Sequence, residues 1–78
     1  MSPDEKLLER LRRRPPQVDF GDVERLLFEF GWERARQRGS HVSFKKSGAR
    51  TITVPLMSGR KVKGVYLDKI FALLELDD

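Results

Sequence analysis

Apolar residues recur at helical spacing in two segments near the start of the chain. Leu7 and Leu8, followed by Leu11 four and three positions later, predict a short helix over residues 4–14, which ends before a Pro-Pro pair. A second helix is predicted over residues 20–30, because phenylalanine, valine and leucine residues recur there on one face. Asp19 precedes this segment as an expected N-cap, and Gly31 follows it at the position of a helix C-terminal glycine.

The hydrophobic period then changes from helical to alternating. Residues 32–37, 41–46 and 50–54 predict three strands joined by tight turns. In the middle strand, Val42 and Phe44 are expected to point toward a core. The opposite, outward face is expected to carry His41, Ser43 and Lys45.

The order of these elements predicts one small α+β domain. A last helix is expected over residues 63–76, with a core face formed by Tyr66, Ile70, Leu73 and Leu74. Three antiparallel strands need one face covered, so the two longer helices should pack on one side of the sheet. We divide the 78 residues into an N-terminal helix with its Pro-Pro linker, residues 1–18, and a folded domain, residues 19–78.

Basic residues are concentrated in one part of the chain. Residues 36–63 contain eight lysines and arginines and no acid, whereas the whole chain has a net charge of +4. A segment of this kind favours a polyanionic partner, and RNA is the one we expect. The sequence contains no apolar run of the roughly 20 residues that span a bilayer, and it begins with charged residues. We therefore expect a cytoplasmic protein without a membrane contact.

The ionisable residues restrict the possible chemistry. There is no cysteine, one histidine, and no carboxylate near that histidine in the sequence, so we expect neither a metal site nor a cofactor. RNA carries its own nucleophile, the 2′-hydroxyl, and a histidine can move the protons that cleavage requires. We therefore predict His41 as the catalytic residue, acting as base, acid or both. The residues expected to bind RNA are Arg36, Arg38, Gly39, Ser40, Ser43, Lys45, Lys61 and Lys63.

Several of these residues form a recognisable pattern. Residues 36–41, Arg-Gln-Arg-Gly-Ser-His, are followed by an alternating strand, by Thr53-Val54-Pro55 and by Lys63-Gly64 at the start of the last helix. This pattern resembles the HicA toxins, small mRNA interferases of HicA–HicB toxin–antitoxin modules, over about residues 20–74. Where family members often carry a second histidine or another polar residue after the Val-Pro pair, this chain has Leu-Met-Ser at residues 56–58.

The resemblance implies a fold, an activity and a partner. The fold would be like a double-stranded-RNA-binding domain, with a helix-strand-strand-strand-helix core and here an extra N-terminal helix. The activity would be mRNA cleavage, with the essential histidine at His41. The partner would be a HicB-like antitoxin that covers the active face, in addition to mRNA.

Two other functions use the same residues. One is a non-catalytic RNA-binding module, in which the basic face binds RNA by shape and 2′-hydroxyl contacts. The other is a protein-interaction domain whose basic face binds an acidic partner. Metal-independent cleavage of RNA would identify the enzyme, and retention of RNA without cleavage would identify the binding module.

Overall fold

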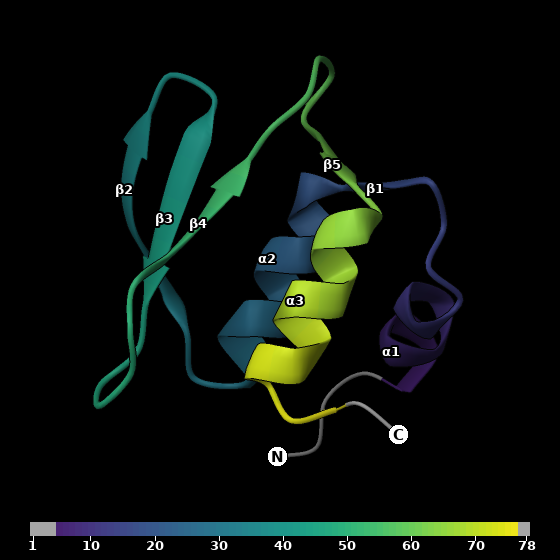
Figure 1. The fold of residues 1–78 in the computed structure, drawn as a ribbon, viewed down its shortest axis with the longest axis horizontal. Helices are drawn as coiled ribbons and strands as arrows, with labels where there is room; N and C mark the ends of the chain where they lie inside the picture. Colours follow the sequence, from purple (N-terminus) through teal and green to yellow (C-terminus); the bar gives the residue numbers. More distant parts are fainter. Residues whose placement is uncertain (1–4, 77–78) are drawn as a thin grey trace.

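The computed structural model describes residues 5–76, which form three helices and five short strands. The elements are α1 (Glu5–Arg12), β1 (Gln17–Asp19), α2 (Phe20–Glu29), β2 (Glu33–Arg38), β3 (His41–Lys45), β4 (Ile52–Pro55), β5 (Lys61–Lys63) and α3 (Val65–Leu73). Strands β2, β3 and β4 make an antiparallel sheet, and α2 and α3 cover one of its faces (Figure 1). The predicted α+β class and three-stranded antiparallel sheet are therefore confirmed. The expected start of the first helix, residue 4, lies outside the described residues.

Helix α2 forms where its apolar spacing predicted it. Phe20, Val23, Leu26 and Leu27 are its buried residues. Its C-terminus is closed by Gly31, which has a φ of +91°, and by a backbone hydrogen bond of 2.9 Å from Trp32 N–H to the Leu27 carbonyl. This geometry is a Schellman motif, for which glycine is the favoured residue.

The expected N-cap of α2 needs one correction. Asp19 occupies the N-cap position, but its side chain makes no capping hydrogen bond. Its carboxylate accepts a hydrogen bond from the Lys61 ammonium instead. The cap was predicted from local sequence alone, whereas the observed partner lies on another strand.

The sheet follows the predicted alternation. Val42, Phe44 and Val54 are buried on the helix-facing side, and the Phe44 ring lies 6.0 Å from the ring of Phe20 on α2. The third strand begins two residues later than expected, at Ile52. It also includes Pro55, which was expected to follow the strand. Proline is tolerated here because β4 is an edge strand.

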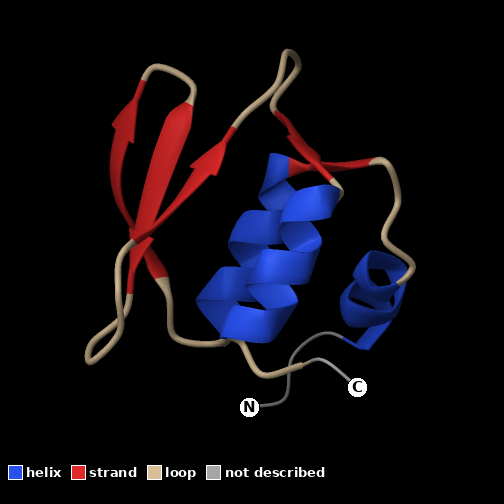
Figure 2. Ribbon diagram, viewed as in Figure 1, coloured by secondary structure: helices blue, strands red, loops and turns tan. Residues whose placement is uncertain are grey.

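A second, two-stranded sheet was not predicted. Strand β1 lies in the segment taken as the end of the Pro-Pro linker, and β5 lies where a loop and the start of the last helix were expected. The two strands pair antiparallel, with the buried Val18 opposite the buried Val62. This pair lies across the N-terminal ends of α2 and α3, and so fixes where both helices begin (Figure 2).

The core face of the last helix also differs from the prediction. Leu67, Ile70 and Phe71 are its buried residues, whereas Tyr66 and Leu74 are half-buried and Leu73 is 37% exposed. The segment is apolar on nearly all sides, so periodicity did not fix which side faces the sheet. None of the helices described here, α3 included, is both long and apolar enough to cross a membrane.

The N-terminal helix shares the core of the domain. Leu7 and Leu11 on α1 are buried in the same apolar cluster as the α2 and sheet residues. The segment after α1 passes so close to Gly64 that a Cβ there would lie 1.9 Å from the Pro15 carbonyl oxygen. The Gly64 N–H also donates a 2.8 Å hydrogen bond to the carbonyl of Pro16. Glycine is therefore required at this crossing.

Candidate RNA-binding and active site

The turn between β2 and β3 places His41 at the start of a strand. Arg38 pairs with His41 in the ladder, so Gly39 and Ser40 are the two turn residues. Gly39 has a φ of +56°, as the first central residue of a type II′ hairpin turn requires. The Ser40 carbonyl accepts a 2.6 Å hydrogen bond from Leu56 N–H, which attaches the turn to the residue after β4. The predicted Gly-Ser turn is thus present. It is fixed by the pairing of Arg38 with His41 on one side and by the hydrogen bond from Leu56 to Ser40 on the other.

His41 faces outward, as alternation predicted. It is exposed, while its neighbour Val42 is fully buried. In the ladder His41 lies between Arg38 on β2 and Pro55 on β4. Residues directly opposite each other in antiparallel strands share a face, so Arg38 and His41 lie side by side. No side chain among residues 5–76 hydrogen-bonds the imidazole, whose two nitrogens are therefore accessible to a ligand.

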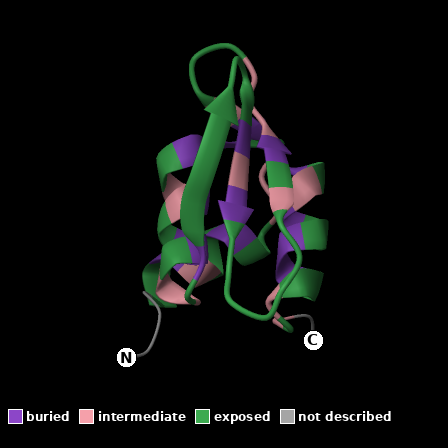
Figure 3. Cartoon of the chain, turned by 90° about the vertical axis from the view of Figure 1, so that its left-hand side faces the viewer, coloured by how far each residue is buried: buried purple, intermediate pink, exposed green. Residues whose placement is uncertain are grey.

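The pairing of β2, β3 and β4 places a second row of side chains on the same outward face. Arg36 lies opposite Ser43, and Ser43 lies opposite Thr53. The Ser43 Oγ and Thr53 Oγ1 atoms are 3.3 Å apart, within hydrogen-bond distance. Figure 3 looks onto this outer face and shows β2 exposed along its whole length. Thr53 was not among the predicted site residues, although the same alternation places it beside Ser43.

The cations of this face have no carboxylate partners. Arg36, Arg38 and Lys45 are exposed, and none of them forms an ion pair with another described residue. Arg34, two residues before Arg36, points to the helix-covered face of the sheet, where it forms a 2.7 Å ion pair with Glu24 of α2. One acid, Glu33, lies opposite Lys45 at the far end of the face from His41. We call the group Arg36, Arg38, His41, Ser43 and Lys45 the strand face.

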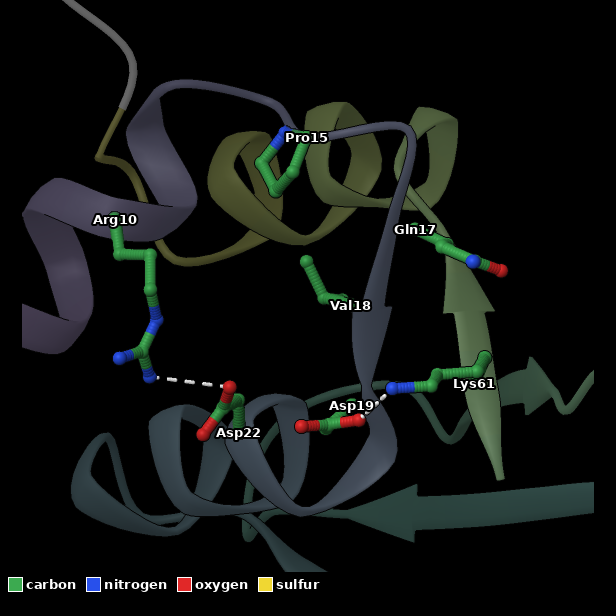
Figure 4. Close-up of a pocket in the computed structure, with 7 residues that line it drawn as sticks. All are labelled: Arg10, Pro15, Gln17, Val18, Asp19, Asp22 and Lys61. Atoms are coloured by element: carbon green, nitrogen blue, oxygen red, sulfur yellow. Dashed lines mark hydrogen bonds and ion pairs between the residues drawn. The ribbon is translucent and has the colours of Figure 1, made fainter. Parts of the chain in front are cut away.

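Lys61 and Lys63 lie elsewhere. Both belong to β5, on the second sheet, so the structure does not bring them onto the strand face. The Lys61 ammonium forms an ion pair with Asp19 (Figure 4), and this hydrogen bond and the positive charge lower the pKa of the Asp19 carboxyl. Lys63 is exposed and lies opposite Gln17.

The Lys61–Asp19 pair borders a polar pocket of about 470 Å³ beside α1. A second ion pair, between Arg10 on α1 and Asp22 on α2, crosses the same pocket at 3.1 Å (Figure 4). Each charge that lines this pocket therefore has an opposite partner. The cations of the predicted site that form no ion pair with a described residue are Arg36, Arg38 and Lys45 on the strand face and Lys63 on β5.

Comparison with known proteins gives one match. The family described as "HicA toxin of bacterial toxin-antitoxin" matches residues 20–76, which include α2, the three-stranded sheet, β5 and α3. A search of curated proteins and a search of solved structures returned no match. HicA toxins pair with an antitoxin. Because the match covers most of the chain, the protein belongs to the HicA family of bacterial toxin–antitoxin toxins.

Proposed function

We propose that this HicA-family toxin is a metal-independent endoribonuclease that cleaves mRNA, with His41 transferring protons in the reaction. The observation that carries the proposal is the setting of His41. Its imidazole is exposed, lies in one row with Arg38, and is next to the row that contains Arg36 and Ser43. The two arginines have no carboxylate partner among the described residues, so their charge is available to a phosphate.

The Gly39-Ser40 turn supports a phosphate contact at this position. The backbone N–H groups of both turn residues have no acceptor within residues 5–76. Consecutive free N–H groups in a turn form a concave anion site. Since His41 follows the turn directly, a phosphate held there would lie next to the imidazole.

The proposed reaction is an attack by the RNA on itself. The 2′-oxygen forms a bond to phosphorus, the bond from phosphorus to the 5′-oxygen breaks, and the products are a 2′,3′-cyclic phosphate and a 5′-hydroxyl. The neutral imidazole of His41 would remove the 2′-hydroxyl proton, or its protonated form would supply the proton to the leaving 5′-oxygen. Arg36 and Arg38 would stabilise the negative charge that develops on the phosphate oxygens.

One histidine cannot serve both oxygens in a single in-line step. The attacking and leaving oxygens lie on opposite sides of phosphorus, so water or a neighbouring cation must handle the second proton. The pH dependence of single-turnover cleavage separates the two roles. If His41 is the base, the cleavage rate rises with pH, and if His41 is the acid, the cleavage rate falls with pH.

We also propose that the domain is folded like a double-stranded-RNA-binding domain. The order α2-β2-β3-β4-α3, with both helices on one side of the sheet, supports this. Strand β5, between β4 and α3, is an addition to that order. A HicB-like antitoxin is the proposed protein partner, and we propose that it covers the strand face when the toxin is inactive.

The test uses purified protein, labelled mRNA and an excess of EDTA. The parent protein should cleave, and His41→Ala should lose at least about 100-fold in rate, the usual contribution of one acid–base residue. Arg13→Ala is a matched surface control, because Arg13 is exposed on the other side of the molecule in an ion pair with Glu9. Circular dichroism confirms that both variants fold. A folded His41→Ala protein that cleaves at the parent's rate would disprove the catalytic role.

Two observations favour a second candidate, a binding module that does not cleave RNA. Among residues 5–76, no side chain hydrogen-bonds the His41 ring and orients it, and the residue at position 57, after the Val-Pro pair, is a half-buried methionine rather than a second acid–base group. In that case the parent protein in EDTA would retain labelled RNA and leave it intact. Retention should weaken steeply as salt is raised.

A further inference from the structure

Strand β4 leaves one edge of the main sheet open. The Leu56 N–H donates to the Ser40 carbonyl, so these opposing residues form a hydrogen-bonded pair. Hydrogen-bonded and non-hydrogen-bonded pairs alternate along an antiparallel ladder. Thr53, opposite Ser43, is therefore in a non-hydrogen-bonded pair, and its N–H and C=O point away from β3. Within residues 5–76, β4 has no strand on that side.

The two edges of the sheet differ in their chemistry. Strand β2 forms the opposite edge, and four of its six residues are charged. Charged residues on an edge strand prevent pairing with a further strand. Strand β4, Ile-Thr-Val-Pro, has no charge, and its first three residues are strong strand formers. Only Pro55, which lacks an N–H, limits how far a new strand can extend. The unprotected edge is the one formed by β4.

An apolar groove runs beside this open edge. It lies between β4 and α3, has a volume of about 280 Å³, and is lined by Ile52, Thr53, Val54, Tyr66, Lys69, Ile70 and Leu73. Ile52 and Tyr66 are half-buried, and Leu73 is partly exposed, so the walls have apolar surface that nothing described covers. An open strand edge beside a helix is the geometry by which several peptide-binding domains add a strand from their ligand.

The charge around the groove specifies the ligand. Lys69, the charged residue among those that line the groove, extends its ammonium to 5.5 Å from the centre of the Tyr66 ring and forms no ion pair with any described residue. The preceding segment, residues 36–63, contains no acid. We infer that the β4–α3 groove binds an extended, acidic segment of a partner protein, which pairs with Thr53 as a fourth strand and inserts apolar side chains.

Two other occupants are disfavoured, a second copy of this chain by its charge and RNA by its lack of strand-like hydrogen bonding. A second copy of this chain, paired β4 to β4, would bring the two unpartnered Lys69 side chains and two basic sheets together, and like charges across strands are destabilising. RNA lacks the alternating donors and acceptors of a strand, and all groove side chains other than Tyr66, Lys69 and Thr53 are aliphatic. Both remain distinguishable outcomes of the test.

The test is a selection of displayed random peptides of about ten residues, the upper length of an ordinary strand. The immobilised parent protein is the target, and Thr53→Pro, which lacks the outward N–H, is used for counter-selection. In the enriched peptides, apolar residues should occur at every second position, and aspartate or glutamate should be present. When an enriched peptide is synthesised and bound to the protein, it should protect the Thr53 amide from hydrogen exchange. Lys69→Glu should weaken its affinity about tenfold, because an exposed attraction becomes a repulsion.

Control variants keep each outcome interpretable. Val65→Ser alters a residue of α3 that is 68% exposed and lies outside the groove, and it should bind the peptide as the parent does. Lys69→Glu changes an exposed residue and carries the test if Thr53→Pro fails to fold. The inference is overturned if no peptide is enriched, or if the enriched peptides bind Lys69→Glu with the same affinity as the parent. It is also overturned if an oligouridine or self-association, rather than a peptide, protects Thr53. RNA cleavage by Lys69→Glu should equal the parent's, so this result is independent of the endonuclease proposal.

Discussion

Neutralising the strand face should change how RNA affinity depends on salt. The perturbation is the triple variant Arg36→Gln, Arg38→Gln and Lys45→Gln, whose parent residues are exposed and have no acidic partner within residues 5–76. Each phosphate contact to single-stranded nucleic acid contributes about 0.7 to the slope of log affinity against log salt. Three lost contacts should therefore reduce the slope by about 2. Between 50 and 200 mM salt, the parent should lose roughly 15 to 20 times more affinity than the variant.

The assay is fluorescence anisotropy with a labelled single-stranded RNA, measured in a His41→Ala background so that cleavage does not interfere. The matched control neutralises Arg10 on α1, Arg13 directly after α1 and Arg25 on α2, each of which forms an ion pair, and so changes the net charge by the same amount. Its slope should stay close to the parent's. If the two triple variants lower the slope equally, only the net charge matters and the strand face is not the RNA site. An unchanged slope in the strand-face variant refutes the reasoning outright.

Three further predictions concern stability. Gly64→Ala should unfold the protein at lower denaturant concentration or prevent folding, because its Cβ would collide with the Pro15 carbonyl, whereas Gly21→Ala has open space at its Cβ and should fold normally. Leu11→Ala, at a fully buried position of α1, should lower the free energy of unfolding by about 2 to 5 kcal/mol in urea denaturation; a negligible change would show that α1 is not part of the core. Asp19→Asn should change the pH dependence, since the ion pair with Lys61 lowers the pKa of Asp19 in the folded state. The stabilisation is present above the unfolded pKa of about 3.9 and is lost as pH falls further, so parent and variant should converge in acid and differ at neutral pH.

The sequence predicted those parts of the fold that repeat a period over enough residues. The alternation of Val42 and Phe44 with His41 and Ser43 is sufficient to place the histidine outward, because a strand has two faces and one of them must be buried. The outward row of side chains on β3 was predictable for the same reason. The glycine at position 31 likewise located the end of α2, since few other residues adopt its backbone conformation.

The parts of the fold that could not be predicted depend on contacts between residues that are far apart in the sequence. Strands β1 and β5 have three residues each, too few for a period, and Val18 and Val62 are far apart in the sequence. The ion pair between Asp19 and Lys61 likewise joins residues 42 positions apart, so local sequence could not predict it. The RNA contact expected for Lys61 stays a prediction. In α3 nearly every side is apolar, and only the position of the sheet selects Leu67 rather than Leu73 as a core residue.

The positions of the ion pairs also explain why a modest net charge gives a strongly basic strand face. The ion pairs of the described residues join carboxylates to bases of α1, of the two residues after it, and of α2, β2 and β5. They include Arg10–Asp22, Arg13–Glu9, Arg14–Asp68, Arg25–Glu29, Arg34–Glu24 and Lys61–Asp19. The cations around His41, namely Arg36, Arg38 and Lys45, form no ion pair with any described residue. Burying such a cation is costly unless it gains a carboxylate or phosphate. Any protein that covers this face must therefore supply acidic side chains where RNA would place its phosphates, so the antitoxin and RNA should compete for the same arginines.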